Sequence, residues 1–202
     1  MLITFEGIDR SGKTTQAQLL ADALGERALL VREPGGTPAA ERVRELVKDR
    51  ALELSPIAET LLFGAARAEL VATVIRPALA QDRVVICDRY VDSTVAYQGG
   101  ARGLGIDRVE ELNEWITEGL EPDLTFLLEL APGAAGARAG VDVDRFEEEG
   151  EELQRAVAAA YEQLAVRHAD RYVRLDADRP PAEVHADVMR VVSQRMGGAA
   201  RR

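Results

Sequence analysis

The most specific chemical pattern in this chain is a glycine-rich segment near its N-terminus. The sequence GIDRSGKT at residues 7–14 fits the pattern G-x-x-x-x-G-K-[ST] and stands between an apolar run and a helix-like stretch. In such a loop, the backbone N–H groups point into one concavity at a helix N-terminus and bind phosphates. Lys13 would reach the outer phosphates of a nucleotide, and Thr14 would offer its hydroxyl to Mg²⁺. We expect the loop to bind nucleotide through Gly7, Ser11, Gly12, Lys13, Thr14 and Thr15.

A second group of polar residues follows a later apolar run. The run VVICD at 84–88 ends in Asp88, and Arg89 comes next. A carboxylate at the end of a strand beside the phosphate-binding loop can reach Mg²⁺, so Asp88 is predicted to bind the metal together with Thr14. Arg89 suits a bidentate contact with a phosphate. A plain helix cap at Asp88 is the structural alternative.

Two further motifs carry side chains suited to a small ligand. The string REPGGT at 32–37 follows another apolar run, at the kind of strand end where open α/β sheets bind ligands. Phe63 and Arg67 are four residues apart, which puts them on one face of a helix. Phe63 could stack on a pyrimidine while Arg67 donates two hydrogen bonds to the base. By residue type alone, Phe63 would instead be a core residue.

The elements that must position these residues alternate along the chain. Short, nearly continuous apolar runs are typical of strands buried on both faces of a parallel sheet. The stretches between them, such as 16–24 and 153–166, have the apolar spacing of helices. This alternation predicts one α/β domain of three layers spanning residues 1–202, with a glycine-rich loop at 98–105. The predicted strands are 2–6, 28–32, 84–88, 124–130 and 172–176.

Composition excludes several other classes of protein. The formal net charge of -10 argues against a nucleic-acid or anionic-membrane binder, which needs a basic face. No stretch of 18 apolar residues is present, and no basic leader precedes the first apolar run. The single cysteine, Cys87, lies in an apolar run and is expected to be a core residue. We therefore expect a cytoplasmic protein.

Taken together, these motifs resemble the thymidylate kinase family of P-loop nucleoside monophosphate kinases, over roughly residues 2–180. The resemblance implies the P-loop kinase fold, with a five-stranded parallel sheet, helices on both faces and a short lid. It implies transfer of the γ-phosphoryl group of ATP, with Mg²⁺, to thymidine 5′-monophosphate (dTMP) in the biosynthesis of dTTP. It also implies a homodimer, for which long helices such as 58–81 could supply an apolar face.

The resemblance further implies roles for individual residues. Arg10 would approach the transferred phosphoryl group, and Asp9 would lie near the phosphate and sugar of the acceptor, or near Mg²⁺ through water. The implied catalytic residues are Asp9, Arg10, Lys13, Asp88 and Arg89. The implied acceptor site consists of Asp9, Glu33, Pro34, Arg44, Phe63, Arg67, Arg89, Ser93, Thr94, Tyr97 and Gln98. Tyr97 would pack by the sugar, while Thr94 and Gln98 would meet the base.

The remaining implied features lie toward the C-terminus. Arg138 would stack on adenine, residues 139–152 would form the lid, and residues 197–202 would be a flexible tail. Arg145 is the one arginine in that lid segment, which suits an enzyme whose catalytic arginine is Arg10. Alternative functions are a kinase for another nucleoside monophosphate, or a P-loop protein that binds nucleotide without catalysis. A guanine-specific switch would need an N-K-x-D motif, which the sequence lacks.

Overall fold

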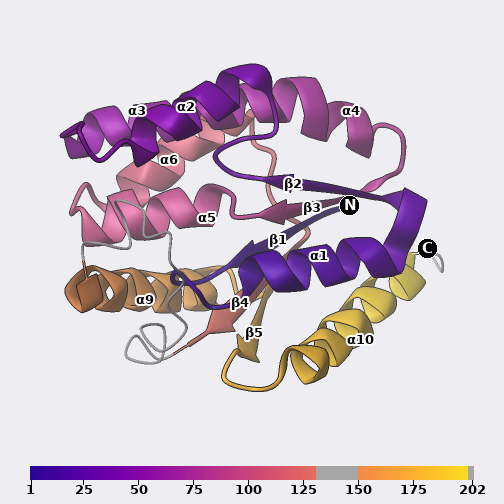
Figure 1. Cartoon of the computed structure of the whole chain (residues 1–202). Helices are drawn as coiled ribbons and strands as arrows, with labels where there is room; N and C mark the ends of the chain where they lie inside the picture. Colours follow the sequence, from indigo (N-terminus) through magenta and orange to yellow (C-terminus); the bar gives the residue numbers. More distant parts are fainter. Residues whose placement is uncertain (131–149, 200–202) are drawn as a thin grey trace.

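The computed structural model describes residues 1–130 and 150–199, and its centre is a sheet of five parallel strands (Figure 1). The spatial order is β2-β3-β1-β4-β5, so the first strand lies in the middle. The bounds are β1 Leu2–Glu6, β2 Ala28–Arg32, β3 Val84–Asp88, β4 Leu124–Glu129 and β5 Tyr172–Asp176. The predicted strands are therefore confirmed, and β4 ends one residue earlier than expected.

The strands form where the apolar runs predicted them because the sheet is covered on both faces. Every residue of β1 is buried, and Phe5 stacks on Phe126 of β4 with ring centroids 5.2 Å apart. The polar side chains inside the sheet satisfy one another, as when Thr4 donates a hydrogen bond to Thr125 at 3.0 Å. Cys87 is fully buried, as expected for a core residue.

Helices cover both faces of the sheet (Figure 1). On one face, α1 packs beside α10, and on the other α4 contacts β3 and α9 contacts the outer strand β5. Thr37 and Ser55 begin α2 and α3 as N-caps, each with proline as the first helical residue. The α-helices are α1 Lys13–Leu24, α2 Pro38–Lys48, α3 Pro56–Leu70, α4 Arg76–Leu79, α5 Val91–Thr94, α6 Ile106–Thr117, α9 Gly150–Arg167 and α10 Pro181–Ala199. A 3₁₀ turn, η1 Gly25–Arg27, and two π-helical turns, η2 Val71–Ile75 and η3 Val95–Ala101, complete the described helices.

The glycine-rich segment 98–105 differs from the prediction. Its first part, through Ala101, belongs to the π-helical turn η3 and is not a loop. The glycines serve close packing here, because a Cβ atom on Gly100 would come within 2.5 Å of the Ala160 side chain on α9. Spacing of glycines along the sequence cannot distinguish a turn from such a helix contact.

The predicted lid and tail are only partly described. Arg138 and residues 139–149 lie outside the described residues, whereas 150–152 form the first turn of α9. Residues 197–199, expected in a flexible tail, continue α10, and 200–202 lie outside the described residues. Within the described chain, the structure has no helix that is long and apolar enough to cross a membrane.

Candidate active site

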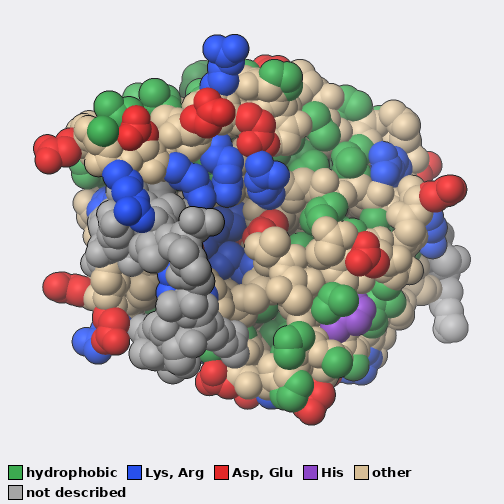
Figure 2. All heavy atoms as spheres, in the orientation of Figure 1, with side chains coloured by type: hydrophobic (Ala, Val, Ile, Leu, Met, Phe, Trp, Pro, Cys, Tyr) green, Lys and Arg blue, Asp and Glu red, His purple; other side chains and the backbone are tan. Residues whose placement is uncertain are grey.

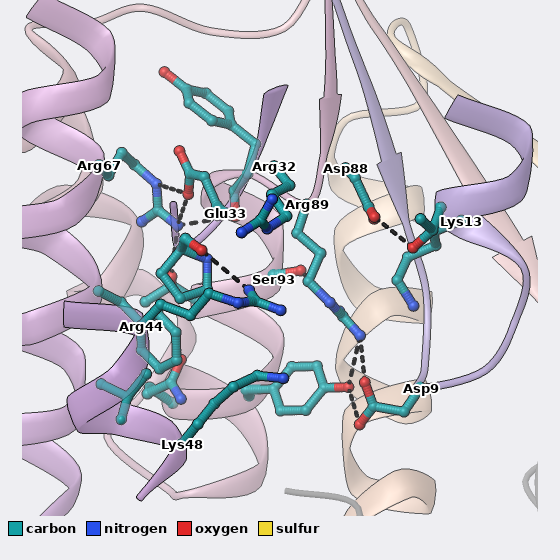
Figure 3. Close-up of a pocket in the computed structure, with 18 of the residues that line it drawn as sticks. Asp9, Lys13, Arg32, Glu33, Arg44, Lys48, Arg67, Asp88, Arg89 and Ser93 are labelled. Carbon is teal, nitrogen blue, oxygen red and sulfur yellow. Dashed lines mark hydrogen bonds and ion pairs between the residues drawn. The ribbon is translucent and has the colours of Figure 1, made fainter. Parts of the chain in front are cut away.

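One cavity of about 340 Å³ opens at the carboxyl ends of β1, β2 and β3. It brings together side chains from segments far apart in the sequence, namely the phosphate loop, the turn after β2, helices α2 and α3, and the segment after β3 (Figure 3). The predicted residues that line it are Asp9, Arg10, Lys13, Thr14, Glu33, Pro34, Arg44, Phe63, Arg67, Asp88, Arg89, Ser93, Thr94, Tyr97 and Gln98.

The phosphate loop has the backbone that its glycines predict. Gly7 has φ 140°, and a Cβ atom at this position would come within 2.5 Å of the Leu128 carbonyl oxygen. Lys13 is buried, and its Nζ donates a hydrogen bond to the Ile8 carbonyl at 2.6 Å. Burial, reinforced by the nearby Arg89, lowers the pKa of Lys13 to about 8. A phosphate at this point would offset both effects, because an anion stabilises the ammonium form.

Thr14 and Asp88 meet at the edge of the loop. The Thr14 hydroxyl donates to Asp88 Oδ2 at 2.5 Å, and the pairing of β1 with β3 sets Asp88 beside Phe5. A hydroxyl and a carboxylate oxygen are ligands that suit Mg²⁺, which usually takes its remaining ligands from water and substrate phosphates. No cluster of three or more metal-binding side chains occurs among the described residues. A Mg²⁺ ion bound by these two oxygens would therefore need water and substrate phosphates as its other ligands.

Asp9, Arg89 and Tyr97 form a compact cluster at the end of the cavity away from Arg67 and Glu33 (Figure 3). Arg89 pairs with Asp9 at 2.5 Å, and the Tyr97 hydroxyl donates to the other carboxylate oxygen of Asp9 at 2.9 Å. Arg89 also lies over the Tyr97 ring, 5.2 Å from its centroid. Burial alone would raise the pKa of Asp9, but Arg89 and Lys13 hold it below its ordinary value. The carboxylate therefore stays ionised and orients the guanidinium.

Arg67 is the most completely enclosed cation of the cavity. It is 1% exposed, and its Nη2 lies 2.6 Å from Glu33 Oε2 in a buried ion pair. It also donates to Asn113 Oδ1 at 2.5 Å, to the Tyr90 carbonyl at 3.1 Å and to Thr94 Oγ1 at 2.9 Å. Burial raises the pKa of Glu33, an effect that Arg67 opposes.

This enclosure limits how many hydrogen bonds Arg67 can offer to a ligand. A guanidinium has five N–H groups, and Nε, one N–H of Nη1 and both of Nη2 are already donated to protein oxygens. One N–H of Arg67 is thus left for a ligand, and a contact with two hydrogen bonds to a base would need a protein contact to be given up. The presence of Phe63 on the same helix face did not reveal this, because the partners of Arg67 come from three other segments.

Two arginines contact the turn after β2 in different ways, Arg32 from the end of β2 and Arg44 from α2. Arg44 donates to the Pro34 carbonyl at 3.0 Å and points into the cavity (Figure 3). Arg32 is paired with Glu41 at 2.8 Å, and Glu41 also accepts from the Gly36 N–H at 2.8 Å. The turn is thus held closed by a carboxylate from α2, while Arg44 is directed at the space where a ligand would lie.

The cavity is basic although the protein as a whole is acidic. Lys and Arg side chains gather in a hollow on the face shown in Figure 2, and those that line the cavity outnumber its three acids. The basic lining residues are Arg10, Lys13, Arg32, Arg44, Lys48, Arg67 and Arg89. A concave wall of one charge sign focuses the field and attracts a ligand carrying several negative charges.

Four loop residues predicted to bind nucleotide do not line the main cavity. Gly7 lines a hollow beside β4, and Ser11, Gly12 and Thr15 line another of about 340 Å³ with Ala177 and Arg179. Both hollows adjoin the phosphate loop, so these four residues lie on sides of the loop next to the main cavity. Arg138 lies outside the described residues.

Sequence reasoning missed several residues of the site. Lys48 lies one helical turn beyond Arg44, a spacing that could have identified it. Glu6 carried no such signal, although it accepts hydrogen bonds from the Tyr90 N–H, Ser93 and Tyr161. Burial, together with Asp92, raises the pKa of Glu6 to about 7. The other unpredicted lining residues are Arg32, Val47 and Tyr90.

Comparisons with known proteins point to one family. The profile of the family described as thymidylate kinase matches residues 5–188. A thymidylate kinase of Synechococcus sp. (strain JA-3-3Ab) is 46% identical over 100% of both chains, and one of Symbiobacterium thermophilum is 45% identical over 96% of this chain and 93% of its own. The crystal structure of thymidylate kinase from Ehrlichia chaffeensis superposes with a TM-score of 0.79 at 35% identity, covering 96% of this chain and 98% of that one. The chain therefore belongs to the thymidylate kinase family.

Proposed function

We propose that this phosphotransferase moves the γ-phosphoryl group of ATP to dTMP, giving ADP and dTDP for dTTP synthesis. The observation that carries the proposal is that one cavity joins a phosphate-binding loop to a cluster suited to a base. Lys13, Thr14 and Asp88 line it together with Arg67 and Gln98. A donor phosphate and a second nucleotide would thus meet within a single enclosed space, as direct transfer requires.

The chemistry needs positioning and positive charge more than proton transfer. An oxygen of the dTMP phosphate forms a bond to the γ-phosphorus while the bond to the β–γ bridging oxygen breaks, and ADP leaves. Arg10 and Lys13 would stabilise the transferring group. Arg89 and Arg44 would hold the acceptor phosphate, and Asp9 supports this role by orienting Arg89 through its ion pair.

ATP is the phosphoryl donor, as for the family. Mg²⁺ belongs to the proposal, with Thr14 and Asp88 as its protein ligands and phosphate oxygens supplying the remainder. Their hydroxyl and carboxylate oxygens approach within 2.5 Å, which fits a site that a small, hard cation would share. When bound, the ion neutralises charge that develops on the phosphates.

For the acceptor, the half-buried Phe63 would stack on the pyrimidine, and Tyr97 would lie beside the sugar and favour its 2′-deoxy form. Glu33 and Pro34 would shape the wall near the acceptor phosphate, and Ser93 would support Arg89, to which it is hydrogen-bonded at 3.0 Å. Arg138 and the segment 139–152 complete the proposal as the adenine contact and the lid. A homodimer in the cytoplasm remains our expectation for the assembly.

The test is a panel of nucleoside monophosphates in a coupled assay of ADP release, run with ATP and Mg²⁺. We expect turnover with dTMP to exceed turnover with adenylate, guanylate or cytidylate. Preference for a purine would contradict the roles of Phe63 and Arg67 and would favour another monophosphate kinase. Tight nucleotide binding with no accepted monophosphate would favour the non-catalytic alternative.

A further inference from the structure

The proposal concerns Glu59, a buried carboxylate behind one wall of the cavity. This wall carries Arg67, Thr94 and Gln98 and is called the base-side wall. Glu59 lies in the first turn of α3, is 1% exposed, and is not among the cavity-lining residues. Gln98, on the π-helical turn η3, does line the cavity and is 2% exposed. The Gln98 Nε2 donates a hydrogen bond to Glu59 Oε1 at 2.8 Å.

The chemistry of this contact determines which way the Gln98 amide faces. An ionised carboxylate has no hydrogen to donate, so the NH₂ end of the amide must point toward Glu59. The opposite orientation would set the amide carbonyl against the carboxylate, two acceptors with no proton between them. The carbonyl oxygen, Oε1, is therefore the end left over. Within residues 1–130 and 150–199, no hydrogen bond to this oxygen is present.

Arg102 pairs with Glu59 and holds its carboxylate in place. Its Nε lies 3.2 Å from Glu59 Oε1, and its Nη2 donates to Oε2 at 3.4 Å, so both carboxylate oxygens contact the guanidinium. Because Arg102 follows η3 directly, one carboxylate from α3 contacts both Gln98, in the middle of η3, and the residue just after its end. A buried carboxylate with a cation and an amide as partners is satisfied and has a defined geometry.

The neighbouring groups of the base-side wall are donors. Arg67 has one N–H left, and the Thr94 hydroxyl already accepts from Arg67, so its own hydrogen is available to donate. Thymine and uracil carry two carbonyl acceptors on either side of an N3–H donor. Cytosine carries an acceptor at N3 and an amino donor at position 4. A wall with one acceptor among donors complements the first pattern and not the second.

We propose that Glu59 is a positioning residue that fixes the Gln98 amide with its carbonyl toward the cavity, and so selects an acceptor base that carries an N3–H. This inference rests on the proposed function, because it names what distinguishes the accepted base. Glu59 acts through Gln98 and does not itself touch the substrate.

The experiment compares Glu59→Gln with Glu69→Gln, which removes the same charge from an exposed position on the same helix. Values of kcat/KM are measured for dTMP, dUMP and dCMP with saturating ATP and Mg²⁺. In Glu59→Gln, the side chain at 59 can donate as well as accept, so Gln98 is free to turn. We expect the dTMP-to-dCMP ratio to fall by about tenfold or more, mainly through KM for dTMP, with KM for ATP unchanged. Glu69→Gln should match the original protein.

An internal control separates positioning from a purely structural effect. Both dTMP and dUMP carry the N3–H, so their ratio should stay the same in Glu59→Gln while the dTMP-to-dCMP ratio narrows. An equal loss for all three acceptors would overturn the proposal, because it would mean that Glu59 only supports the fold. Should Glu59→Gln fail to fold, the double variant Glu59→Gln, Arg102→Gln removes the ion pair as a whole and carries the same expectation.

The proposal can also be tested on the unmodified protein, without any variant. It should favour dTMP over dCMP by about a hundredfold or more, since a site built to pair with a donor rejects an acceptor strongly. Comparable activity with dTMP and dCMP would overturn the inference and leave phosphoryl transfer intact. Absence of turnover with every pyrimidine monophosphate would instead remove the proposed function, and this inference with it.

Discussion

The two sides of the cavity are built differently. On the base side, Arg67 is held by buried side chains and a backbone carbonyl, and Gln98 is held by Glu59. On the phosphate side, a glycine-rich backbone carries Lys13, whose ammonium turns back to the carbonyl of Ile8 in its own loop. The base side is thus organised before any ligand arrives, whereas the phosphate side offers a cation whose strongest partner would be the ligand.

This difference predicts how the two sides respond to substitution. Buried ion pairs and hydrogen bonds stabilise the fold only while both partners are present, so base-side changes should reduce stability as well as binding. Lys13 has a lowered pKa because burial already disfavours its charge, so its loss should affect catalysis far more than folding. The experiments below test this contrast, beginning with the largest expected effect.

Lys13→Ala should abolish most of the activity and leave the fold intact. The charge that stabilises the transferring phosphoryl group is removed, which we expect to lower kcat by about a thousandfold or more. Steady-state kinetics with ATP and dTMP measures the loss, and thermal unfolding should show a melting temperature close to that of the unmodified protein. A variant that keeps more than a tenth of the activity would contradict the role of Lys13.

Arg67→Ala should destabilise the protein by about 3–5 kcal/mol, because it leaves the Glu33 carboxylate buried without its partner. Urea unfolding gives this value. Arg42→Ala, an exposed arginine on α2, is the matched control and should change stability by less than about 0.5 kcal/mol. Adding Glu33→Gln to Arg67→Ala should recover part of the loss. If the two changes were simply additive, the pair would not be coupled as proposed.

Arg44→Ala should weaken acceptor binding and leave stability almost unchanged. Arg44 is half-buried and donates to the Pro34 carbonyl at 3.0 Å, so its charge stays partly solvated and its loss leaves no fully buried partner such as the one that Arg67 has. Loss of a charged contact to the dTMP phosphate should raise KM for dTMP by about ten- to thirtyfold, with a smaller change in kcat. Arg42→Ala, two residues earlier on α2, again serves as control. An unchanged KM would place the acceptor phosphate elsewhere.

The affinity for ATP should depend on pH through Lys13. Its pKa of about 8 in the free protein means that the charged form predominates below pH 8 and is lost above it. Phosphate favours the charged form, so the affinity for a non-hydrolysable ATP analogue should fall by about tenfold between pH 7 and pH 9. Calorimetric titration measures this decrease. Lys13→Arg does not titrate in this range, and its affinity should stay level.

Local patterns predicted the parts of the site that each motif contains. The phosphate loop was recognisable because a loop of this kind needs glycine, lysine and threonine at set spacings, whatever the rest of the protein does. Asp88 was recognisable because it ends an apolar run, and the structure brings it to Thr14. The roles of the acceptor residues stay predictions, although the structure gathers them around one cavity.

Partners that come from different segments could not be predicted. The four acceptors around Arg67 belong to the turn after β2, to α6 and to the segment after β3, and no spacing within α3 reveals them. Gly99 and Gly100 were wrongly assigned to a loop for the same reason. The small size of Gly100 matters because Ala160 of α9, distant in the sequence, packs against it, and that of Gly99 because the start of α6 packs against it.

The amino-acid sequence by itself determined the alternation of strands and helices, the phosphate loop and the kind of ligand that such a loop attracts. These features depend on hydrophobic period and backbone freedom, which are local properties. Only the tertiary structure decided that Arg67 is enclosed, that Glu59 faces Gln98 and that basic side chains from several segments share one hollow. Burial and hydrogen-bond partnership are relations between residues distant in the chain, so they exist only once the sheet and its helices have assembled.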